Sequence, residues 1–514
     1  MSVTTRYHSA GTMMFAALCC GSSLFAQEPE IPVLQMSESA TATDAAPYDL
    51  LGTAVALQED TLFVGARGAD AIAANGGAVY LFEPDEDGWA QVQKLTGSNT
   101  MSNDEFGSSL AVSGVRLAVG VPRHDVDAEP DAGRVVLFTF NGASWIESAT
   151  ITPPVPQTDA GFGSTIALDD RTLAVGVPGH DTGIRNEGEV HLYTFDDKTV
   201  TWSLEATLVA PDSGENDRFG ASLDLVGDLL VVGVEADDDA GIDAGAAWVY
   251  RRLDGTWTPE TKLTGTEGEW FARFACAVAI NEDATTIAVG VERSDLFGVD
   301  DGAVMLWDYD PSTGAWSTGP VLGAAGAAGT RELGFSVAFD GDRLVAGMPV
   351  ADDPAPDAGA AMLYTRLGPE TWAADVVLQP ALAGELELCG YAVAASAGRI
   401  AVGRPLAGGN GSWLGDCFVV DLTDDCNEND VPDPIELAYG SAADSNENGV
   451  LDVCECFGDL NLDGVVDGAD LSILLGYWGT FPENLPQADI NGDGTVSGSD
   501  LSILLGYWGP CETP

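Results

Sequence analysis

The stretch that decides the fold is residues 106–140, which read FGSSLAVSGVRLAVGVPRHDVDAEPDAGRVVLFTF. Three segments in it are apolar and β-branched, at 108–114, 116–122 and 133–140. A glycine turn separates the first two segments, and an Asp-rich loop separates the second from the third. Short apolar runs bounded by Gly, Pro and Asp are typical of β-strands joined by turns. The stretch therefore predicts three antiparallel strands.

This unit occurs seven times, which makes it a structural repeat. Successive units start 55 to 59 residues apart, at Leu51-Gly52, Phe106-Gly107, Phe162-Gly163, Phe219-Gly220, Phe274-Ala275, Leu333-Gly334 and Cys389-Gly390. In six units a tryptophan follows the third strand and opens a fourth, more polar segment: Trp89, Trp145, Trp202, Trp257, Trp316 and Trp372. Each unit therefore predicts four antiparallel strands.

Seven units of four strands predict a mainly β chain that folds as a seven-bladed β-propeller. One unit cannot bury both of its faces, but a closed ring of units can, and closure also removes unpaired sheet edges. The seventh unit has no fourth strand after Leu422. Residues 31–37 (IPVLQMS) precede the first unit as VQKLTGS precedes the second. We therefore expect this N-terminal strand to complete the seventh blade.

The unit resembles the FG-GAP repeat of integrin α-chain propellers and of related exported bacterial proteins. The resemblance rests on Phe-Gly and Gly-Val-Pro at fixed phase, as in Phe106-Gly107 with Gly120-Val121-Pro122 and Phe162-Gly163 with Gly176-Val177-Pro178. It covers residues 31–422 and implies a seven-bladed propeller used for adhesion or ligand binding. Units one, six and seven depart from the pattern because they lack the phenylalanine, and unit five has Ala275 in place of glycine.

The loops before the third strands are acidic, and integrin-type blades often carry calcium in such loops. The aspartates concerned are Asp131, Asp243, Asp301 and Asp357. They do not keep an alternating acidic spacing, and Asp beside Gly suits a tight turn. We interpret them as turn residues, with calcium in the blades as the open alternative.

The C-terminal segment contains two copies of a loop that supplies oxygen atoms at the spacing calcium requires. Positions 1, 3, 5, 9 and 12 carry Asp, Asn or Ser, position 6 carries Gly, and position 7 offers its carbonyl. The predicted ligands are Asp459, Asn461, Asp463, Val465, Asp467 and Asp470 in the first loop, and Asp489, Asn491, Asp493, Thr495, Ser497 and Asp500 in the second. The predicted cofactor is Ca²⁺, because two metal-free turns would not repeat the full spacing.

Each loop leads into the same ten residues, DLSILLGYWG, at 470–479 and 500–509. The pair resembles a type I dockerin, which implies two pseudo-symmetric helices and a cohesin as partner. The Gly-Tyr-Trp-Gly ends stand where cellulosomal dockerins carry basic residues, which argues against cohesin binding here. We expect a small core rather than a ligand face from Leu471, Ile473, Leu474 and Trp478 and their counterparts Leu501, Ile503, Leu504 and Trp508.

Two further loops of this spacing precede the dockerin-like pair. The first offers Asp425, Asn427, Asn429, Val431, Asp433 and Glu436, and the second offers Asp444, Asn446, Asn448, Val450, Asp452 and Glu455. They resemble thrombospondin type 3 calcium repeats, in which calcium and disulfides supply the order that a small core cannot. An acidic disordered linker is the alternative.

The N-terminal 26 residues are typical of a secretory signal peptide, with Arg6, an apolar run at 13–18 and a small residue before Gln27. The expected domains are this signal (1–26), the propeller (27–422), the thrombospondin-like linker (423–456) and the dockerin-like domain (457–514). Export permits disulfides. We predict the pairs Cys389–Cys417, Cys426–Cys454 and Cys456–Cys511, with Cys276 left over.

The 514 residues include 81 acidic and 20 basic side chains, for a formal net charge of -61. Such a surface repels phosphate backbones and anionic lipids, which excludes nucleic acid as a partner. No segment after the signal is long and apolar enough to cross a membrane. Only His124, His180 and His191 follow the signal, and serine-hydrolase, zinc-protease and phosphate-loop motifs are missing. No residue is therefore assigned a catalytic role.

The sequence predicts an exported, calcium-binding propeller protein, secreted or at the cell surface. It would bind an unidentified extracellular protein or glycan without catalysis. Two alternatives stay open. One is a polysaccharide hydrolase or lyase with a dockerin-like tail, because paired carboxylates would be hard to recognise among 81 acidic residues. The other is a structural component of the cell envelope.

Overall fold

The structure, a computed structural model, describes residues 31–510 apart from short internal segments. These segments are 86–87, 266–269, 325–330, 369–370, 409–410, 424, 427–430, 443–450, 452–457, 462–464, 481–487 and 491–493. The predicted signal peptide and the cysteines Cys454, Cys456 and Cys511 lie outside the described residues.

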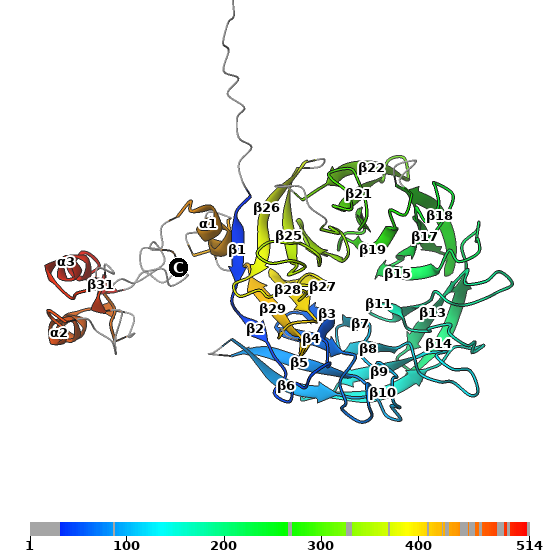
Figure 1. Cartoon of the computed structure of the whole chain (residues 1–514), viewed down its shortest axis with the longest axis horizontal. Coiled ribbons are helices and arrows are strands. Elements are labelled where there is room, and N and C mark those ends of the chain that lie inside the picture. The colour runs from blue at the N-terminus through cyan, green and yellow to red at the C-terminus, as the bar shows by residue number, and fades with distance from the viewer. Residues whose placement is uncertain are drawn as a thin grey trace, which may run out of the picture. The chain divides into compact units, whose positions relative to one another are not determined.

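Seven sheets make up the propeller, as the repeats predict (Figure 1). Blade one consists of β3 (Leu51–Gln58), β4 (Thr61–Ala66), β5 (Ala78–Asp85) and β6 (Gly88–Leu95), and blade two of β7 (Leu110–Ser113), β8 (Arg116–Val121), β9 (Arg134–Phe140) and β10 (Trp145–Ile151). Blade three consists of β11 (Thr165–Asp169), β12 (Thr172–Val177), β13 (Glu189–Asp196) and β14 (Thr201–Leu208). Blade four consists of β15 (Phe219–Val226), β16 (Leu229–Val234), β17 (Ala246–Leu253) and β18 (Thr256–Thr264). Each repeat tryptophan is the first or second residue of a fourth strand, which confirms that prediction.

Blades five to seven continue the same antiparallel order. Blade five consists of β19 (Phe274–Ile280), β20 (Thr286–Val291), β21 (Ala303–Asp310) and β22 (Ala315–Leu322). Blade six contains β23 (Val337–Asp340), β24 (Arg343–Met348), β25 (Ala360–Gly368) and β26 (Thr371–Pro380). Blade seven contains β27 (Ala392–Ser396), β28 (Arg399–Arg404) and β29 (Asp416–Asp421). The first strand of each blade packs against the first strands of both neighbours, so these strands surround the central axis (Figure 1).

Each blade is tied to the next by one parallel backbone bridge. The bridge joins the glycine before a third strand to the first residue of the following repeat: Gly77–Phe106, Gly133–Phe162, Gly188–Phe219, Gly245–Phe274, Gly302–Leu333, Gly359–Cys389 and Gly415–Leu51. The last pair joins blade seven to blade one. The bridges therefore form a complete ring.

The N-terminal segment closes blade seven, as expected, but with a different strand from the one predicted. The fourth strand of this blade is β2 (Ser39–Ala40), which pairs antiparallel with β29. The predicted residues 31–37 instead contain β1 (Val33–Met36), which runs parallel to β26 as a fifth strand of blade six. The assignment of 31–37 to blade seven is therefore wrong.

The reason for this difference lies at the edge of blade six. The backbone N–H groups of Val377 and Ala381 donate to the carbonyls of Pro32 and Met36 at 2.9 Å, so β1 satisfies an edge that would otherwise be unpaired. The Met36 side chain is buried in the cluster between blades six and seven. One short segment therefore covers two adjacent blades.

The two residues of each Phe-Gly pair have separate roles. The phenylalanine is buried between blades, as at Phe219, whose ring meets Tyr250 edge to face at 6.0 Å. The glycine that follows, Gly220, has φ +91°, a left-handed conformation that strains residues with a Cβ. Leu and Cys replace Phe in the other blades and are equally buried, at Leu51, Leu333 and Cys389. This position therefore accepts different apolar side chains, all of which are buried.

Ala275 holds the glycine position of blade five at φ +64°. Replacing Ala275 by glycine is expected to raise the free energy of unfolding by about 0.5–1 kcal/mol, because glycine adopts a left-handed backbone without strain. Urea denaturation of the full chain measures the change. The matched control Gly220→Ala should change stability in the opposite direction. A less stable Ala275→Gly variant would refute this explanation of the Phe-Gly pair.

Two sets of side-chain hydrogen bonds join the innermost strands of neighbouring blades. In the first set, hydroxyls donate to backbone carbonyls at 2.7–2.9 Å: Ser109 to Gly163, Thr165 to Gly220, Ser222 to Ala275 and Ser336 to Gly390. In the second set, carboxylates accept from backbone N–H groups at 2.5–2.7 Å: Asp169 from Gly227, Asp224 from Ile280 and Asp340 from Gly398. These bonds add side-chain ties to the bridges.

One carboxylate of the second set, Asp224, predicts that the free energy of unfolding depends on pH. Burial raises the pKa of this carboxyl to about 6, although the N–H groups of Ile280 and Leu225 lower it. A raised pKa means that the folded state holds the proton more tightly. The contribution of Asp224 to stability is therefore present below the unfolded pKa, near 4, and is lost as the pH rises through about 6.

Comparison with Asp224→Asn isolates this effect, because asparagine can still accept from Ile280 but does not titrate. We expect the stability of the variant relative to the native chain to rise between pH 4.5 and pH 7. Urea denaturation at fixed calcium concentration measures the difference. Two stability curves that stay parallel over this range would contradict the prediction.

The predicted disulfide Cys389–Cys417 does not form, and both cysteines are free and buried. Cys389 packs in the cluster between blades six and seven, whereas Cys417 packs in the cluster between blades seven and one. The two thiols therefore point to opposite faces of blade seven. Cys276 is also free, as predicted. Cys426 is disulfide-bonded.

The chain after the last blade forms the short helix α1 (Asp433–Tyr439). Ile435 is buried in the cluster of blades six and seven, and Ala438 packs against the same cluster. The predicted thrombospondin-like linker therefore gains apolar packing from the propeller at this point, which the sequence pattern did not indicate. Residues 443–450 and 452–457 of the linker are not described.

Candidate functional site

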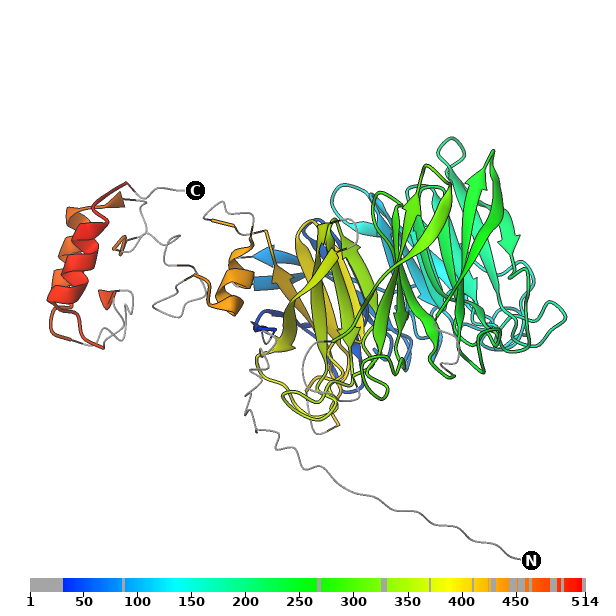
Figure 2. The same cartoon turned by 90° about the horizontal axis from the view of Figure 1, so that it is seen from above.

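The two predicted loop-helix repeats of the tail form a pair of capped helices, α2 (Gly468–Gly476) and α3 (Gly498–Gly506), which lie side by side (Figure 2). Asp467 caps α2 and accepts from the N–H of Ala469, while Ser497 caps α3 and accepts from Ser499. Both helices carry a reciprocal capping box. Positions 9 and 12 of each loop therefore also determine where its helix begins.

The helices enclose a small apolar core. Leu460, Val466, Leu474, Ala488, Ile490, Val496 and Leu504 are buried in it. The two halves exchange backbone contacts, because β30 (Val465–Val466) pairs with β31 (Gly509–Pro510) and the Gly479 N–H donates to the Val496 carbonyl at 2.8 Å. The region directly after each loop is therefore held by the far end of the other repeat.

The residues at position 12 of both loops are completely buried carboxylates, at Asp470 and Asp500. One oxygen of Asp470 accepts from the N–H groups of Leu460 and Asn461, at 2.8 and 3.2 Å, and the other accepts from Asp467 at 2.8 Å. Asp470 therefore joins the start of the loop to its end.

The surroundings of one carboxylate oxygen in the second loop favour a cation at that site. Asp489 stands at position 1, and its Oδ2 accepts from the N–H of Gly494 at 2.7 Å. Its Oδ1 is buried and has no hydrogen-bond partner among the described residues. A buried, unpaired carboxylate oxygen is costly unless a cation or donor meets it. The donor set of this loop, all oxygen, fits calcium.

Only part of the predicted ligand set lies within the described residues. Asp459, Asn461, Val465, Asp467 and Asp470 of the first loop and Asp489, Thr495, Ser497 and Asp500 of the second are described. Upstream, Asp425, Val431, Asp433 and Glu436 are described. The other predicted ligands lie outside the described residues: Asp463, Asn491, Asp493, Asn427, Asn429, Asp444, Asn446, Asn448, Val450, Asp452 and Glu455.

The first upstream loop resembles the tail loops in one respect. Its position 9 and position 12 residues, Asp433 and Glu436, both lie in the first turn of α1 and are largely buried. The carboxylate of Asp433 accepts from the N–H of Cys426 at 3.2 Å. This loop, too, therefore runs directly into a helix.

The prediction for the tail core is wrong for the tryptophans. Leu474 and Leu504 are buried, and Leu471, Ile473, Leu501 and Ile503 pack against the core. Trp478 and Trp508, however, are 46 % and 49 % exposed. Leu475 and Leu505 are exposed as well. The helices end at glycine before the tryptophans, so helical periodicity no longer directs these side chains into the core.

The acidic loops of the blades are turns, as interpreted. Asp131, Asp243 and Asp357 have φ near +50°, and each backbone N–H donates to an aspartate five or six residues earlier. In blade five the turn residue is Asp300 rather than the predicted Asp301. Asp301 is instead buried and pairs with Arg331 at 3.3 Å. The prediction of Asp301 as the turn residue is therefore wrong by one position.

Blade four holds a carboxylate cluster that sequence reasoning missed. Among the described residues, Asp212, Asp237 and Asp239 are the group close enough to share a cation. The ammonium of Lys262 lies 2.7 Å from each of them. Burial lowers the pKa of this lysine, but the hydrogen bonds to the three aspartates more than offset it and raise the pKa. Lysine thus supplies the cation in this cluster.

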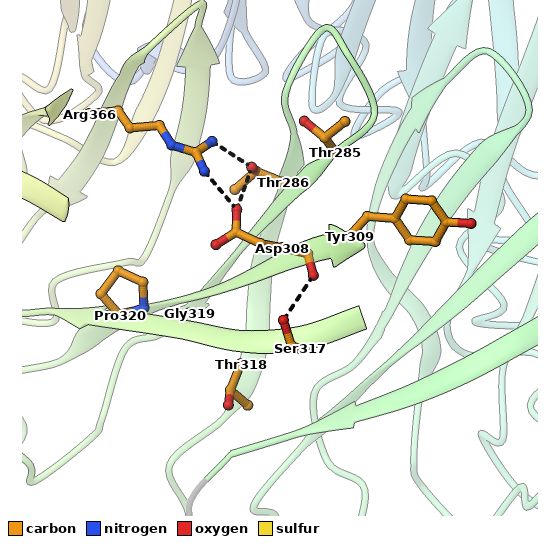
Figure 3. Close-up of a pocket in the computed structure, with 9 residues that line it drawn as sticks. All are labelled: Thr285, Thr286, Asp308, Tyr309, Ser317, Thr318, Gly319, Pro320 and Arg366. Carbon is orange, nitrogen blue, oxygen red and sulfur yellow. Dashed lines mark hydrogen bonds and ion pairs between the residues drawn. The ribbon is translucent and has the colours of Figure 1, made fainter. Parts of the chain in front are cut away.

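A polar groove of about 560 Å³ lies between blades five and six (Figure 3). Arg366 donates to Thr286 Oγ1 at 3.0 Å and to Asp308 Oδ1 at 3.1 Å, and Thr286 donates to Asp308 at 2.8 Å. The ring of Tyr309 points away from these groups (Figure 3). These polar side chains form hydrogen bonds with one another, and through Arg366 they join blade six to blade five.

The same tie occurs between blades three and four. Arg252 reaches Thr172 Oγ1 and Glu205 Oε2, both at 3.4 Å. The arginine and threonine are separated by 80 residues in both ties. This repetition indicates a structural contact between neighbouring blades rather than a unique reactive site.

The three histidines are also part of the repeat architecture. His124 lies 2.9 Å from Asp104 through Nδ1. His180 is buried near Glu189, at 3.4 Å, and Glu189 also contacts His191. Burial lowers the pKa of His180, although Glu189 raises it.

None of the helices in the described part of the chain has the length and apolar character needed to span a membrane.

Comparison with family models agrees with this architecture. The FG-GAP repeat model matches residues 37–82, 89–138, 145–193 and 202–250, and the dockerin type I domain model matches residues 457–507. The chain thus carries four FG-GAP repeats and a dockerin type I domain, and dockerin type I domains are calcium-binding modules. Blades five to seven complete the propeller beyond the matched repeats.

Three solved structures are similar to part of the chain at low sequence identity. A functionally unknown protein from Desulfotomaculum acetoxidans is 11 % identical, with 68 % of this chain and 93 % of that one covered and a TM-score of 0.42. Saccharomyces cerevisiae Sqt1 is 12 % identical, with 76 % and 100 % covered and a TM-score of 0.43. A protein from Lactobacillus plantarum is 14 % identical, with 64 % and 85 % covered and a TM-score of 0.44. No curated protein sequence matches the chain.

Proposed function

We propose that the chain is an exported, non-catalytic binding protein. The propeller recognises an extracellular protein or glycan, and the calcium-loaded tail docks onto a protein partner of the cohesin type. The observation that carries the proposal is the buried Oδ1 of Asp489, which has no hydrogen-bond partner in the described part of the chain and belongs to a loop whose other donors are oxygen atoms. It supports calcium in the tail, and a dockerin type I domain supports the docking role.

Calcium would be held by the loop residues at positions 1, 3, 5, 7, 9 and 12, and it would neutralise their negative charge. In the first loop these include Asp459 and the buried Asp470, and in the second Asp489 and the buried Asp500. The upstream loop at Asp433 and Glu436 would hold a further ion. Because each loop leads directly into its helix, calcium binding would fix the direction of both helices.

The exposed ends of the two helices suit a docking role. Leu475 and Trp478 on one repeat and Leu505 and Trp508 on the other are large apolar side chains left in solvent. Exposed tryptophans are typical of residues that dominate protein interfaces. Their partner would bury apolar area here, in place of the basic contacts that cellulosomal dockerins make.

Binding of the full chain to an immobilised type I cohesin tests the proposal. We expect binding in 2 mM calcium, loss of binding in EGTA, and at least tenfold weaker binding for the double variant Trp478→Ser/Trp508→Ser. Val200→Ser, an exposed apolar residue of the propeller, is the matched control. Absence of both cohesin binding and calcium-induced stabilisation, or turnover of a polysaccharide by the chain, would overturn the proposal.

A further inference from the structure

One position of the propeller repeat has a left-handed backbone, and in blade five a large apolar side chain occupies it although this conformation disfavours such residues. This position lies three residues before the repeat start and is Asn103, Asp159 or Asn216 in blades two to four, with φ between +59° and +67°. Asn and Asp tolerate such a left-handed backbone. In blade five the position is Phe271, at φ +61°.

A backbone hydrogen bond to the loop of the preceding blade accompanies this conformation. The N–H of Phe271 donates to the Ile242 carbonyl of the preceding loop at 2.8 Å, just as Asn216 donates to Arg185 at 2.8 Å. The side chain is free to vary, however, and that of Phe271 is 51 % exposed. Leu386 in blade seven and Tyr48 in blade one are strained and exposed in the same way, at φ +60° and +74°. The position alone therefore assigns no role, and the neighbours of Phe271 decide what this side chain can contact.

Two more apolar side chains adjoin Phe271. Trp270 lies against the backbone of Gly241, where an added Cβ would come within 2.4 Å of ring atom Cδ1. The indole is nevertheless 63 % exposed, and Ile242 is 50 % exposed. The tryptophan is therefore held in position on one side and offered to solvent on the other.

The same loop continues into an arginine pair at this end of the innermost strands. Arg273 donates to Glu292 at 2.5 Å and to Glu235 at 2.7 Å, and Arg218 donates to Glu235 at 2.5 Å. The glutamates are 2 % and 9 % exposed, whereas the arginine side chains are 35 % and 50 % exposed. The buried negative charges face inward, so the outer surface here presents positive charge.

This local charge is unusual for a chain with a formal net charge of -61. A polyanion such as an acidic polysaccharide would meet repulsion from the rest of the surface. One carboxylate beside an apolar group could contact the exposed guanidinium groups of Arg218 and Arg273, although the loop that carries Ile242 also contains aspartates such as Asp243. Tryptophan and arginine are also the residues that most often dominate protein interfaces. The charge pattern therefore favours a protein segment.

We propose that Ile242, Trp270, Phe271, Arg218 and Arg273, here called the blade-five surface, bind a protein segment that presents an aspartate or glutamate beside a large apolar residue. The carboxylate would use guanidinium N–H donors that the buried glutamates leave open, and the apolar group would pack on Trp270 and Phe271. The inference rests on the proposed function, because it takes the propeller as the recognition part.

Selection of a displayed library of random 12-residue peptides on the immobilised full chain tests this inference. The enriched peptides should combine an acidic residue with Phe, Trp or Leu, and a synthetic peptide of this kind should bind at least tenfold more weakly when its acid is replaced by the amide. Phe271→Asn and Trp270→Ser should each weaken binding at least tenfold. Phe271→Asn should also raise the melting temperature by about 1–2 °C, since asparagine relieves the backbone strain.

Leu386→Asn is the matched control, because Leu386 occupies the same position in blade seven at φ +60°. It should gain stability without changing peptide binding. Equal binding by all variants, enriched peptides without an acidic residue, competition by alginate at equal strength, or self-association abolished by Phe271→Asn would overturn the inference. Peptide binding should persist in EGTA, so its failure is distinguishable from failure of the calcium-dependent tail.

Discussion

Removing calcium from the full chain is expected to unfold the tail while the propeller stays folded. The described part of the tail has a core of seven buried apolar residues, which is too few to stabilise so short a segment without help. Each site adds about 2.7 kcal/mol when free calcium is a hundredfold above Kd, so two sites add about 5 kcal/mol. Without metal, the buried aspartates Asp470 and Asp500 would also lose a countercharge.

Differential scanning calorimetry measures this effect as two transitions. EGTA should abolish the tail transition and leave the propeller transition in place. Asp489→Ala should lower the tail transition in calcium, because it removes the position 1 ligand of one loop. Asp243→Ala, which changes an aspartate at a propeller turn, is the control and should leave the tail transition unchanged. A tail transition that is insensitive to EGTA would refute calcium dependence.

Replacing Phe219 by alanine is expected to lower the free energy of unfolding of the propeller by about 3–5 kcal/mol. The ring is fully buried between blades three and four and meets Tyr250 edge to face. Removing it leaves a cavity that a ring of closely tied blades cannot collapse around, and large-to-small changes in such sites cost this much. The loss would weaken one blade interface and, through ring closure, the whole propeller.

Urea denaturation followed by tryptophan fluorescence measures the loss. Phe140→Ala is the matched control, because Phe140 is the same residue type but is 38 % exposed. It should cost less than about 1.5 kcal/mol. Equal effects of the two substitutions would mean that the Phe-Gly phenylalanines do not anchor the blade interfaces.

The sequence predicted the propeller because its repeat is dictated by backbone requirements. Glycines such as Gly220 recur because φ is positive there, and buried residues such as Phe219 recur because every blade interface needs an apolar anchor. These constraints act on single residues at fixed phase. They can therefore be recognised without any knowledge of the tertiary structure.

The closing strand could not be predicted in the same way. β2 (Ser39–Ala40) is only two residues long, too short for an alternating pattern, whereas residues 31–37 read as a strand and pair with blade six instead. The predicted pair Cys389–Cys417 failed for a related reason. Both cysteines belong to one blade, but burial on opposite faces of its sheet is a property of the ring and not of the spacing.

Side-chain surroundings in the candidate sites were also hidden from the sequence. The signal for Lys262 was weak, since one lysine in a polar fourth strand gives no sign that three aspartates from two loops converge on it. The exposure of Trp478 depends on where α2 ends. The blade-five surface became visible only through the left-handed backbone at Phe271. Composition and periodicity contain none of this information.

The number of calcium ions bound by the full chain tests the central claim most directly. Equilibrium dialysis with metal analysis should give three or four ions per chain, two of which are lost in the double variant Asp459→Ala/Asp489→Ala. A count of zero would contradict a calcium-loaded tail, and so would a count that the double variant leaves unchanged.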